Sequence, residues 1–301
     1  MSGFRTVVIE SPCKVTYKDG FMVVRGDDLR LVHLSELHTL ILDTTMVTVT
    51  GYLLCELVKA KVNLVFCDEK RQPAGQIMPF YGSHDSAGRV AEQAVWPEKR
   101  KAFLWQQIIR QKIIHQATLL KKVDPTAAAQ IASFATSVEP GDPTNREGHA
   151  AKMYFRRIFG PGFQRDIKSD RNAALNYGYS LLLSSFNKEI VSRGYTTQLG
   201  IHHRNMYNHF NLGSDLMESF RYLIDRMVLE KGDICFDKSY KYALLELLGL
   251  PVRYGGQEVV MTTAIARTVR NATEYLGGRI DWTEDMLFHG EDADNAADCD
   301  V

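Results

Sequence analysis

The spacing of apolar residues changes near residue 89 and divides the chain into two kinds of sequence. Before that point, short β-branched or aromatic segments alternate with turn residues, a pattern typical of strands. After it, apolar residues recur every three or four positions, a spacing typical of helices. The first helical run contains Phe103, Ile108, Ile109, Ile113 and Ile114. The sequence therefore predicts an α+β fold in which a small β-rich N-terminal domain precedes a larger all-helical domain.

Turn residues and charge runs predict where these domains begin and end. The β-rich domain is expected over residues 1–80, and a linker over 81–98, because 81–87 is rich in Gly, Ser and Asp. The helical domain is expected over 99–290. Residues 291–301 are acidic and bury nothing, so we expect a disordered tail. Strands are predicted at 6–10, 14–17, 21–25, 29–32, 39–42 and 63–67, and one N-terminal helix at about 50–60.

The formal net charge of zero hides an uneven distribution of charge. Residues 281–301 contain eight Asp or Glu and no Lys or Arg. Residues 99–173 contain fourteen Lys or Arg and six Asp or Glu, so the positive excess lies in that segment. A local positive field suits a polyanion such as nucleic acid. Composition alone supports a solvated helical surface equally well.

Cysteine usage and hydropathy exclude several classes of protein. The five cysteines are odd in number and widely spaced, which argues against a disulfide framework or a structural zinc site and predicts buried free thiols. No apolar run approaches the roughly 18 residues of a membrane span, and the N-terminus lacks the apolar core of a signal peptide. We therefore expect a cytoplasmic protein without membrane contact.

Three residues that are far apart in the sequence are candidate metal ligands: Glu147, His203 and Glu218. Two carboxylates and an imidazole can hold a hard divalent cation such as Mg²⁺ or Mn²⁺ and leave positions open for water and phosphate. A cation held in this way can assist phosphodiester chemistry.

Each candidate also has a simpler interpretation. Glu147 is expected in the first turns of a helix capped by Thr144, where a glutamate can merely complement the helix dipole. His203 is one of three histidines in a short segment, and a single histidine is more often structural. No one of these features is decisive alone.

Glu218 is expected on a helix whose other face is apolar. Asp215, Glu218 and Asp225 share one stripe of that helix, and their charges repel unless a cation or arginines such as Arg221 neutralise them. The stripe is therefore either a solvated face or part of a cation site. The apolar face of the same helix carries Leu216, Phe220, Leu223 and Met227.

Longer motifs are more specific than these single residues. They lie at 3–8 (GFRTVV), 33–36 (HLSE), 66–73 (FCDEKRQP), 80–86 (FYGSHDS), 142–149 (DPTNREGH) and 172–179 (NAALNYGY). In these motifs and their order the chain resembles the integrase of CRISPR adaptation, the CRISPR-associated endonuclease that inserts new spacers. It is most similar to the type II branch of that family.

The family pattern selects one histidine. Its ligand histidine precedes an Asp-Leu-x-Glu motif, with the Asp twelve and the Glu fifteen positions later, and this spacing fits His203, Asp215 and Glu218. His202 misses by one position. The family's usual Glu-Pro-Phe-Arg-Pro reads Glu-Ser-Phe-Arg-Tyr from Glu218, so we expect a shifted helix start or a loop there, with the ligand retained.

The resemblance implies that Glu147, His203 and Glu218 are both metal ligands and catalytic residues, with Asp215 supporting them. A 3′-hydroxyl of double-stranded protospacer DNA would attack a phosphodiester at the leader–repeat border, then another at the far end of the repeat. The basic segment 99–171 would grip phosphates without reading sequence. A nearby histidine can accept the proton of the attacking hydroxyl, and the sequence does not single out one histidine for this role.

The resemblance also implies an assembly. The N-terminal domain would form a homodimer, and two such dimers would flank a dimer of a small ferredoxin-like adaptation partner. The type II effector nuclease and a ring-shaped DNA-binding accessory protein can also take part. Two alternatives remain open: a metal-dependent DNase that uses water in place of the 3′-hydroxyl, and a catalytically silent DNA-binding scaffold.

Overall fold

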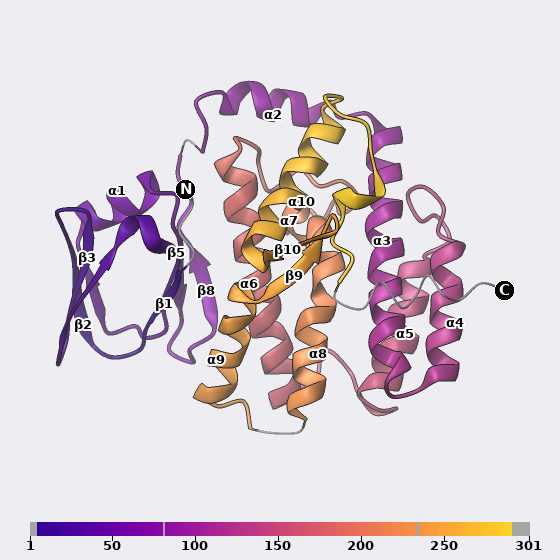
Figure 1. The fold of residues 1–301 in the computed structure, drawn as a ribbon, viewed down its shortest axis with the longest axis horizontal. Helices are drawn as coiled ribbons and strands as arrows, with labels where there is room; N and C mark the ends of the chain where they lie inside the picture. The colour runs from indigo at the N-terminus through magenta and orange to yellow at the C-terminus, as the bar shows by residue number, and fades with distance from the viewer. Residues whose placement is uncertain (1–4, 81, 233–234, 291–301) are drawn as a thin grey trace.

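A strand-rich N-terminal part lies beside a larger helical part in the computed structural model, which describes residues 5–80, 82–232 and 235–290 (Figure 1). The predicted α+β class is confirmed. The N-terminal elements are β1 (Arg5–Ile9), β2 (Cys13–Lys18), β3 (Phe21–Arg25), β4 (Leu29–His33), β5 (Leu37–Leu42), β6 (Val47–Val49), α1 (Gly51–Lys59), β7 (Asn63–Cys67) and β8 (Pro73–Gln76).

The N-terminal strands form two sheets, ordered β1-β5-β7-β8 and β4-β3-β2-β6. In the first sheet, β5 pairs in parallel with both β1 and β7, while β8 is antiparallel to β7. In the second, β2, β3 and β4 form an antiparallel meander, and β6 adds in parallel to β2. The turn between β2 and β3 falls at Asp19-Gly20, where both residues have positive φ, as a tight hairpin requires.

The first sheet is buried on both faces. Successive side chains of a strand point to opposite faces. Leu40 and Leu64 therefore join a core between the two sheets, while their neighbours Ile41 and Val65 join the core of the helical part. All four are at most 2% exposed. This sheet fixes the strand-rich part against the helices.

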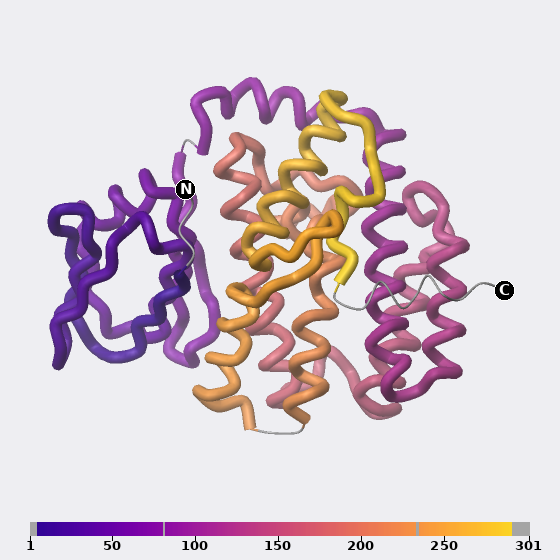
Figure 2. Tube along the Cα trace, viewed as in Figure 1, coloured from indigo at the N-terminus to yellow at the C-terminus, as the bar shows by residue number. Residues whose placement is uncertain are grey.

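The helical part is built around two long helices, α3 and α6. Helix α2 crosses one end of the part and leads into α3, while α4 and α5 pack beside α3 (Figure 1, Figure 2). The helices are α2 (Ser86–Ala94), α3 (Glu98–Lys121), α4 (Pro125–Thr136), α5 (Arg146–Ile158), α6 (Asp170–Ser192), α7 (Asn211–Leu216), α8 (Arg221–Lys231), α9 (Lys238–Glu246) and α10 (Met261–Leu276).

The prediction of an all-helical second domain is wrong in one respect. Strands β9 (Pro251–Tyr254) and β10 (Gln257–Val260) form an antiparallel hairpin that packs on α10. Val252 and Tyr254 face inward, and Gly255-Gly256 make the turn with positive φ at both residues. The alternation and the Gly-Gly pair were sequence signals for this hairpin.

Some of the other predictions differ from the structure, and some are not tested by it. The segment predicted as a linker contains helix α2. The domain boundaries stay a prediction, and the acidic tail 291–301 lies outside the described residues. The described cysteines are free, but Cys55 and Cys235 are exposed, so the prediction of buried thiols is wrong for these two. Among the described helices, none combines the length and the apolar character needed to cross a membrane.

Candidate active site

Glu147 lies in the first turn of α5, as predicted, but the predicted cap is wrong. Asn145 caps the helix in a left-handed conformation (φ 51°), and its Oδ1 accepts a hydrogen bond from Gly148 N at 3.1 Å. The buried Asp142 accepts two more, from Arg146 N at 2.8 Å and from Glu147 N at 3.0 Å. Asp142 and Asn145, rather than Thr144, therefore satisfy the free N–H groups of this helix start and fix the backbone of Glu147.

Glu218 lies in a break between two helices, so the prediction of one continuous helix is wrong. Helix α7 ends at Leu216, residues Glu218–Phe220 form a 3₁₀ turn, and α8 starts at Arg221. The irregular turn falls where the changed motif predicted a shifted helix start or a loop. It packs on α3, and the Glu218 side chain is only 5% exposed.

Lys112 of α3 brings the two candidate glutamates together. Its Nζ lies 2.6 Å from Glu147 Oε1 and 2.6 Å from Glu218 Oε2. The other Glu218 oxygen, Oε1, lies 3.0 Å from Nη2 of Arg221. Both oxygens of Glu218 therefore face a cationic side chain, and one buried ammonium is shared by both glutamates.

These charges hold one another in their ionised forms. Burial by itself would lower the pKa of Lys112, but Glu218 and Glu147 raise it above its ordinary value. Burial would likewise raise the pKa of Glu218, but Arg221 and Lys112 lower it below its ordinary value. The site is a compensated ionic cluster in which charges of both signs are buried together.

His203 is held in place by a buried carboxylate. Its Nδ1 contacts Asp215 Oδ1 in a short hydrogen bond, and Asp215 also accepts the backbone N–H groups of Ile201, His202 and His203. The Asp215 side chain is fully buried. With Nδ1 occupied in this way, Nε2 is the ring nitrogen left for a ligand, the usual arrangement of a metal-binding histidine and its supporting carboxylate.

The hydrogen bond to Asp215 raises the pKa of His203 above its ordinary value, and the charges of Glu218 and Glu147 add to this effect. Gly200 permits the tight loop that presents the imidazole, because a Cβ there would lie 2.5 Å from His203 O and 2.7 Å from Asp215 Oδ2.

Trp105, also on α3, packs beneath the two neighbouring histidines. The His202 ring stacks on it at a centroid distance of 4.3 Å, whereas the His203 ring meets it edge-on at 5.6 Å. Trp105 is 1% exposed, so it is a rigid support. Stacking fixes the plane of the His202 ring, whereas His203 is the histidine whose ring is bonded to the supporting carboxylate.

The donor types fit a hard divalent cation. Two carboxylates already share one positive charge, the imidazole has Nε2 free of its supporting carboxylate, and within the described residues no hydrogen-bond donor is aligned with the buried Glu218 Oε2. The arrangement is not preassembled, however, because the described part of the chain holds no group of three His, Cys, Asp or Glu ready to bind a metal. Glu147, His203 and Glu218 therefore remain predicted ligands.

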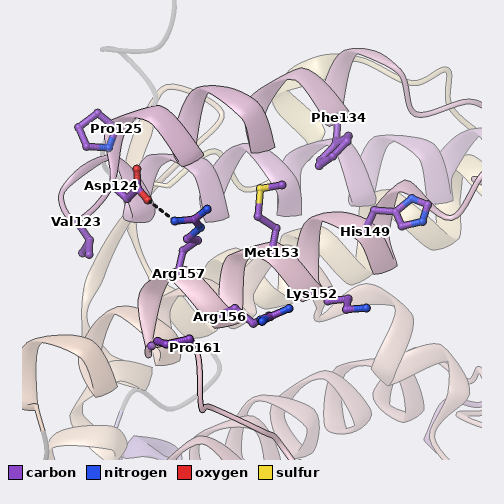
Figure 3. Close-up of a pocket in the computed structure, with 11 residues that line it drawn as sticks. Val123, Asp124, Pro125, Phe134, His149, Lys152, Met153, Arg156, Arg157 and Pro161 are labelled. Atoms are coloured by element: carbon purple, nitrogen blue, oxygen red, sulfur yellow. Dashed lines mark hydrogen bonds and ion pairs between the residues drawn. The ribbon is translucent and has the colours of Figure 1, made fainter.

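A large basic groove lies elsewhere, between α4 and α5. It has a volume of about 1090 Å³ and is lined by His149, Lys152 and Arg156 of α5 and by Phe134 of α4 (Figure 3). These three α5 residues are exposed, whereas Ala150 and Tyr154, on the Glu147 side of the helix, are fully buried. The groove therefore lies on the face of α5 opposite the candidate centre.

The sequence analysis missed the central role of Lys112, which was only one of fourteen basic residues in its segment. A local signal existed, because Lys112 follows Ile108 and Ile109 at helical spacing and so falls on the apolar stripe of α3. A charged residue on a buried stripe needs a partner. Asp142 was also missed, although it precedes a helix start.

Comparisons with known proteins agree on one family. The model of a family described as "CRISPR associated protein Cas1" matches residues 6–233. A protein named "CRISPR-associated endonuclease Cas1" from Neisseria meningitidis serogroup C (strain 8013) is 32% identical over 228 residues, which cover 75% of each chain.

Solved structures share the fold at lower identity. A structure described as "Casposase bound to integration product" has a TM-score of 0.75 at 17% identity, covering 94% of this chain and 93% of that one. One described as "Cas6-RT-Cas1--Cas2 complex" has a TM-score of 0.72 at 18% identity. The match covers 95% of this chain but only 36% of the chain in that complex.

Proposed function

The chain belongs to the Cas1 family of CRISPR-associated proteins, and on that basis we propose that it is a metal-dependent DNA integrase and endonuclease of CRISPR adaptation. The observation that carries the proposal is the pairing of Glu147 and Glu218 on one buried cation, with His203 held by the buried Asp215 of α7. The names of the Neisseria relative and of the casposase structure support a nuclease and strand-transfer chemistry. Membership of the type II branch is also proposed, on the sequence motifs.

The proposed reaction is a transesterification. The oxygen of a 3′-hydroxyl on protospacer DNA attacks a phosphorus at the leader–repeat border, forming one P–O bond. The bond from that phosphorus to the bridging 3′-oxygen of the leader end breaks. The attacking hydroxyl gives up its proton as the bond forms, and the leaving 3′-oxygen takes up a proton to become a new 3′-hydroxyl, so the number of P–O bonds is unchanged. A bound Mg²⁺ or Mn²⁺ would lower the pKa of the attacking hydroxyl and stabilise negative charge at the phosphorus.

The protein's own residues would position this chemistry. Glu147, His203 and Glu218 would hold the cation, and Asp215 would orient His203 through Nδ1. Arg221 would keep Glu218 ionised through its contact with Oε1. No protein nucleophile is required, so we expect no covalent intermediate between the enzyme and DNA.

The proposed assembly follows the family. We propose a cytoplasmic homodimer formed through the strand-rich part, with two dimers flanking one dimer of a Cas2-type partner. The solved complex that contains Cas1 and Cas2 supports such a partner. The DNA substrates are the protospacer duplex and the leader–repeat, and the type II effector nuclease and the ring-shaped accessory protein are proposed as further partners.

One assay tests the function. The protein and its Cas2-type partner are mixed with a duplex bearing free 3′-hydroxyls and a supercoiled plasmid that carries the repeat, with Mn²⁺ or Mg²⁺. Covalent joining at the repeat border is expected. Cutting without joining would instead support the DNase, and DNA binding without either product would support the silent scaffold.

Matched variants connect the products to the site. Glu147→Gln, His203→Gln and Glu218→Gln should each abolish joining, because each replaces a proposed ligand by a neutral amide of similar size. Glu189→Gln is the control, since Glu189 also pairs with a buried lysine, Lys188 at 2.6 Å, but on α6. Loss of joining in the control to the same extent would show that the effect is not specific to the site.

A further inference from the structure

Glu218 has no carboxylate oxygen free of a cation. Lys112 Nζ is 2.6 Å from Oε2, and Arg221 Nη2 is 3.0 Å from Oε1. A divalent cation that binds Glu218 competes with these two ion pairs, because two positive charges placed on one carboxylate oxygen repel each other.

Arg221 is the more firmly held of the two cations. Its guanidinium lies over the Tyr179 ring at 4.8 Å, and the Tyr179 hydroxyl donates to the buried Asp225. A planar guanidinium stacked in this way is pre-organised, whereas an ammonium on a four-carbon stem rotates easily. Opening the Arg221 pair would also release only Glu218, while moving Lys112 would release Glu218 and Glu147 together.

The contact of Lys112 with Glu218 is close but poorly directed. The two atoms are 2.6 Å apart, yet across the described residues no donor is aligned for a hydrogen bond with Glu218 Oε2. Charge is therefore the larger part of the attraction between Lys112 and Glu218. A divalent cation that Glu218 Oε2 coordinates can replace the ammonium with little loss of hydrogen bonding.

The protein also offers the ammonium another position. A cavity of about 70 Å³ lies beside Lys112 and Glu218. Its wall carries Gln116 and Asp225 as well as two arginines, Arg165 and Arg221. Gln116 lies one turn after Lys112 on α3 and is 3% exposed, and its Oε1 has no hydrogen-bond partner in the described part of the molecule. A buried acceptor without a donor is costly unless it is used in another state.

We propose that Lys112 is an exchangeable counterion of the metal centre. Without metal its ammonium neutralises Glu147 and Glu218 and keeps the two carboxylates together. When a divalent cation enters, the ammonium moves into the adjoining cavity and donates to Gln116 Oε1. This inference rests on the proposed metal-dependent function. It adds that Glu147 and Glu218 pair with Lys112 when no metal is bound and with the divalent cation when it is bound.

Metal binding, measured without any reaction, tests this exchange. Titration calorimetry with Mn²⁺ should show that Lys112→Met binds roughly tenfold more tightly than the wild type, about 1.4 kcal/mol, because no ammonium has to be displaced. Without metal the variant should unfold at a lower temperature, and Mn²⁺ should raise its Tm by more than it raises the wild-type Tm. Equal or weaker Mn²⁺ binding by the folded variant would overturn the proposal.

Two further variants separate exchange from a general loss of stability. Lys188→Met removes an equally buried lysine, 10% exposed against 11% for Lys112, from its pair with Glu189, and it should leave Mn²⁺ affinity unchanged. A tighter Mn²⁺ affinity in this control would count against the exchange. Gln116→Leu keeps the Lys112 ion pairs and removes the second position, so it should weaken Mn²⁺ binding severalfold.

The Gln116→Leu variant decides the matter if Lys112→Met does not fold. Unchanged Mn²⁺ affinity in Gln116→Leu would overturn the proposed movement. A wild-type protein that binds no Mn²⁺ at all would overturn the metal centre itself, and with it the exchange. A wild type that binds Mn²⁺, with variants that bind equally well, would overturn the exchange alone.

Discussion

At the scale of single residues, Asp215 organises the loop that carries His203. It accepts four hydrogen bonds, three from backbone N–H groups and one from the ring of His203, and it is completely buried. A neutral amide in its place has one acceptor oxygen and an NH₂ group that points at donors. The Asp215 carboxylate therefore fixes both the backbone of the loop and the orientation of the His203 ring.

We predict that Asp215→Asn lowers strand transfer by about 10–100-fold, the usual effect of losing the partner of a metal-binding histidine. It should also lower the free energy of unfolding by about 1–3 kcal/mol, since buried donors lose their acceptor. Plasmid joining and urea denaturation measure the two effects. Asp237→Asn is the control, because Asp237 likewise accepts from a backbone N–H, that of Tyr240, at the start of α9. Normal joining by Asp215→Asn would contradict the role given to this carboxylate.

A second residue, His38, makes the stability of the fold depend on pH. Burial lowers its pKa to about 3, and the charge of Lys188 acts in the same direction. In the unfolded chain its pKa is about 6.5. Between these values the unfolded chain binds a proton that the folded chain does not, so stability falls as the pH drops through this range.

We therefore expect the free energy of unfolding to fall more steeply between about pH 6.5 and pH 4 in the wild type than in His38→Gln, by up to about 1.4 kcal/mol per pH unit. Urea denaturation across this range measures the slope for both proteins. Parallel slopes would show that His38 does not account for the loss in acid.

At the scale of elements, α5 presents charged side chains of opposite sign on its two faces. Its inner face holds Glu147 against Lys112, and its outer face presents His149, Lys152 and Arg156 to the groove beside α4 (Figure 3). A row of exposed cations can contact DNA phosphates without reading sequence. The positive excess of this segment is thus partly exposed beside the groove and partly the counter-charge of the two buried glutamates.

We predict that Lys152→Gln combined with Arg156→Gln weakens DNA binding equally for different sequences and reduces the slope of log K against log salt by about two. Joining at saturating DNA should be unchanged, because Glu147 lies on the other face. Fluorescence anisotropy at several salt concentrations measures the slope. Lys59→Gln with Arg30→Gln, two exposed cations of the strand-rich part, is the control. An unchanged slope in the α5 variant would exclude the groove as a DNA contact.

The helices also show which features could be predicted from the sequence and which could not. Periodicity predicted α3 because its apolar residues repeat over many turns, but it could not reveal the break at Glu218. Leu216, Phe220 and Leu223 are all buried, so a broken helix satisfies the same apolar pattern as a continuous one. The motif spacing selected His203. The apolar stripe of α3 could have shown that Lys112 is buried, but not which glutamates pair with it, because these lie on other elements.

At the scale of the whole molecule, the sheet β1-β5-β7-β8 connects the two parts. It contributes to the core between the sheets with one face and to the helical core with the other. Polar contacts add to this connection: Asn63 Nδ2 donates to Ser184 Oγ at 3.1 Å, and Gln76 Nε2 donates to Ser184 O at 2.7 Å. These groups are buried or partly buried, so separating the parts would leave them unsatisfied.

The shared sheet should make the two parts unfold together. Leu40 and Ile41 are adjacent on β5 and both fully buried, but they point into different cores. If the two parts unfold together, Leu40→Ala and Ile41→Ala should each lower the same single unfolding transition by about 2–5 kcal/mol. Calorimetry gives the number of transitions, and hydrogen exchange in β5 and α6 reports each part separately. Two transitions, with Leu40→Ala shifting only the one that belongs to the strand-rich part, would show instead that this part unfolds independently and that its sheet does not hold the helices in place.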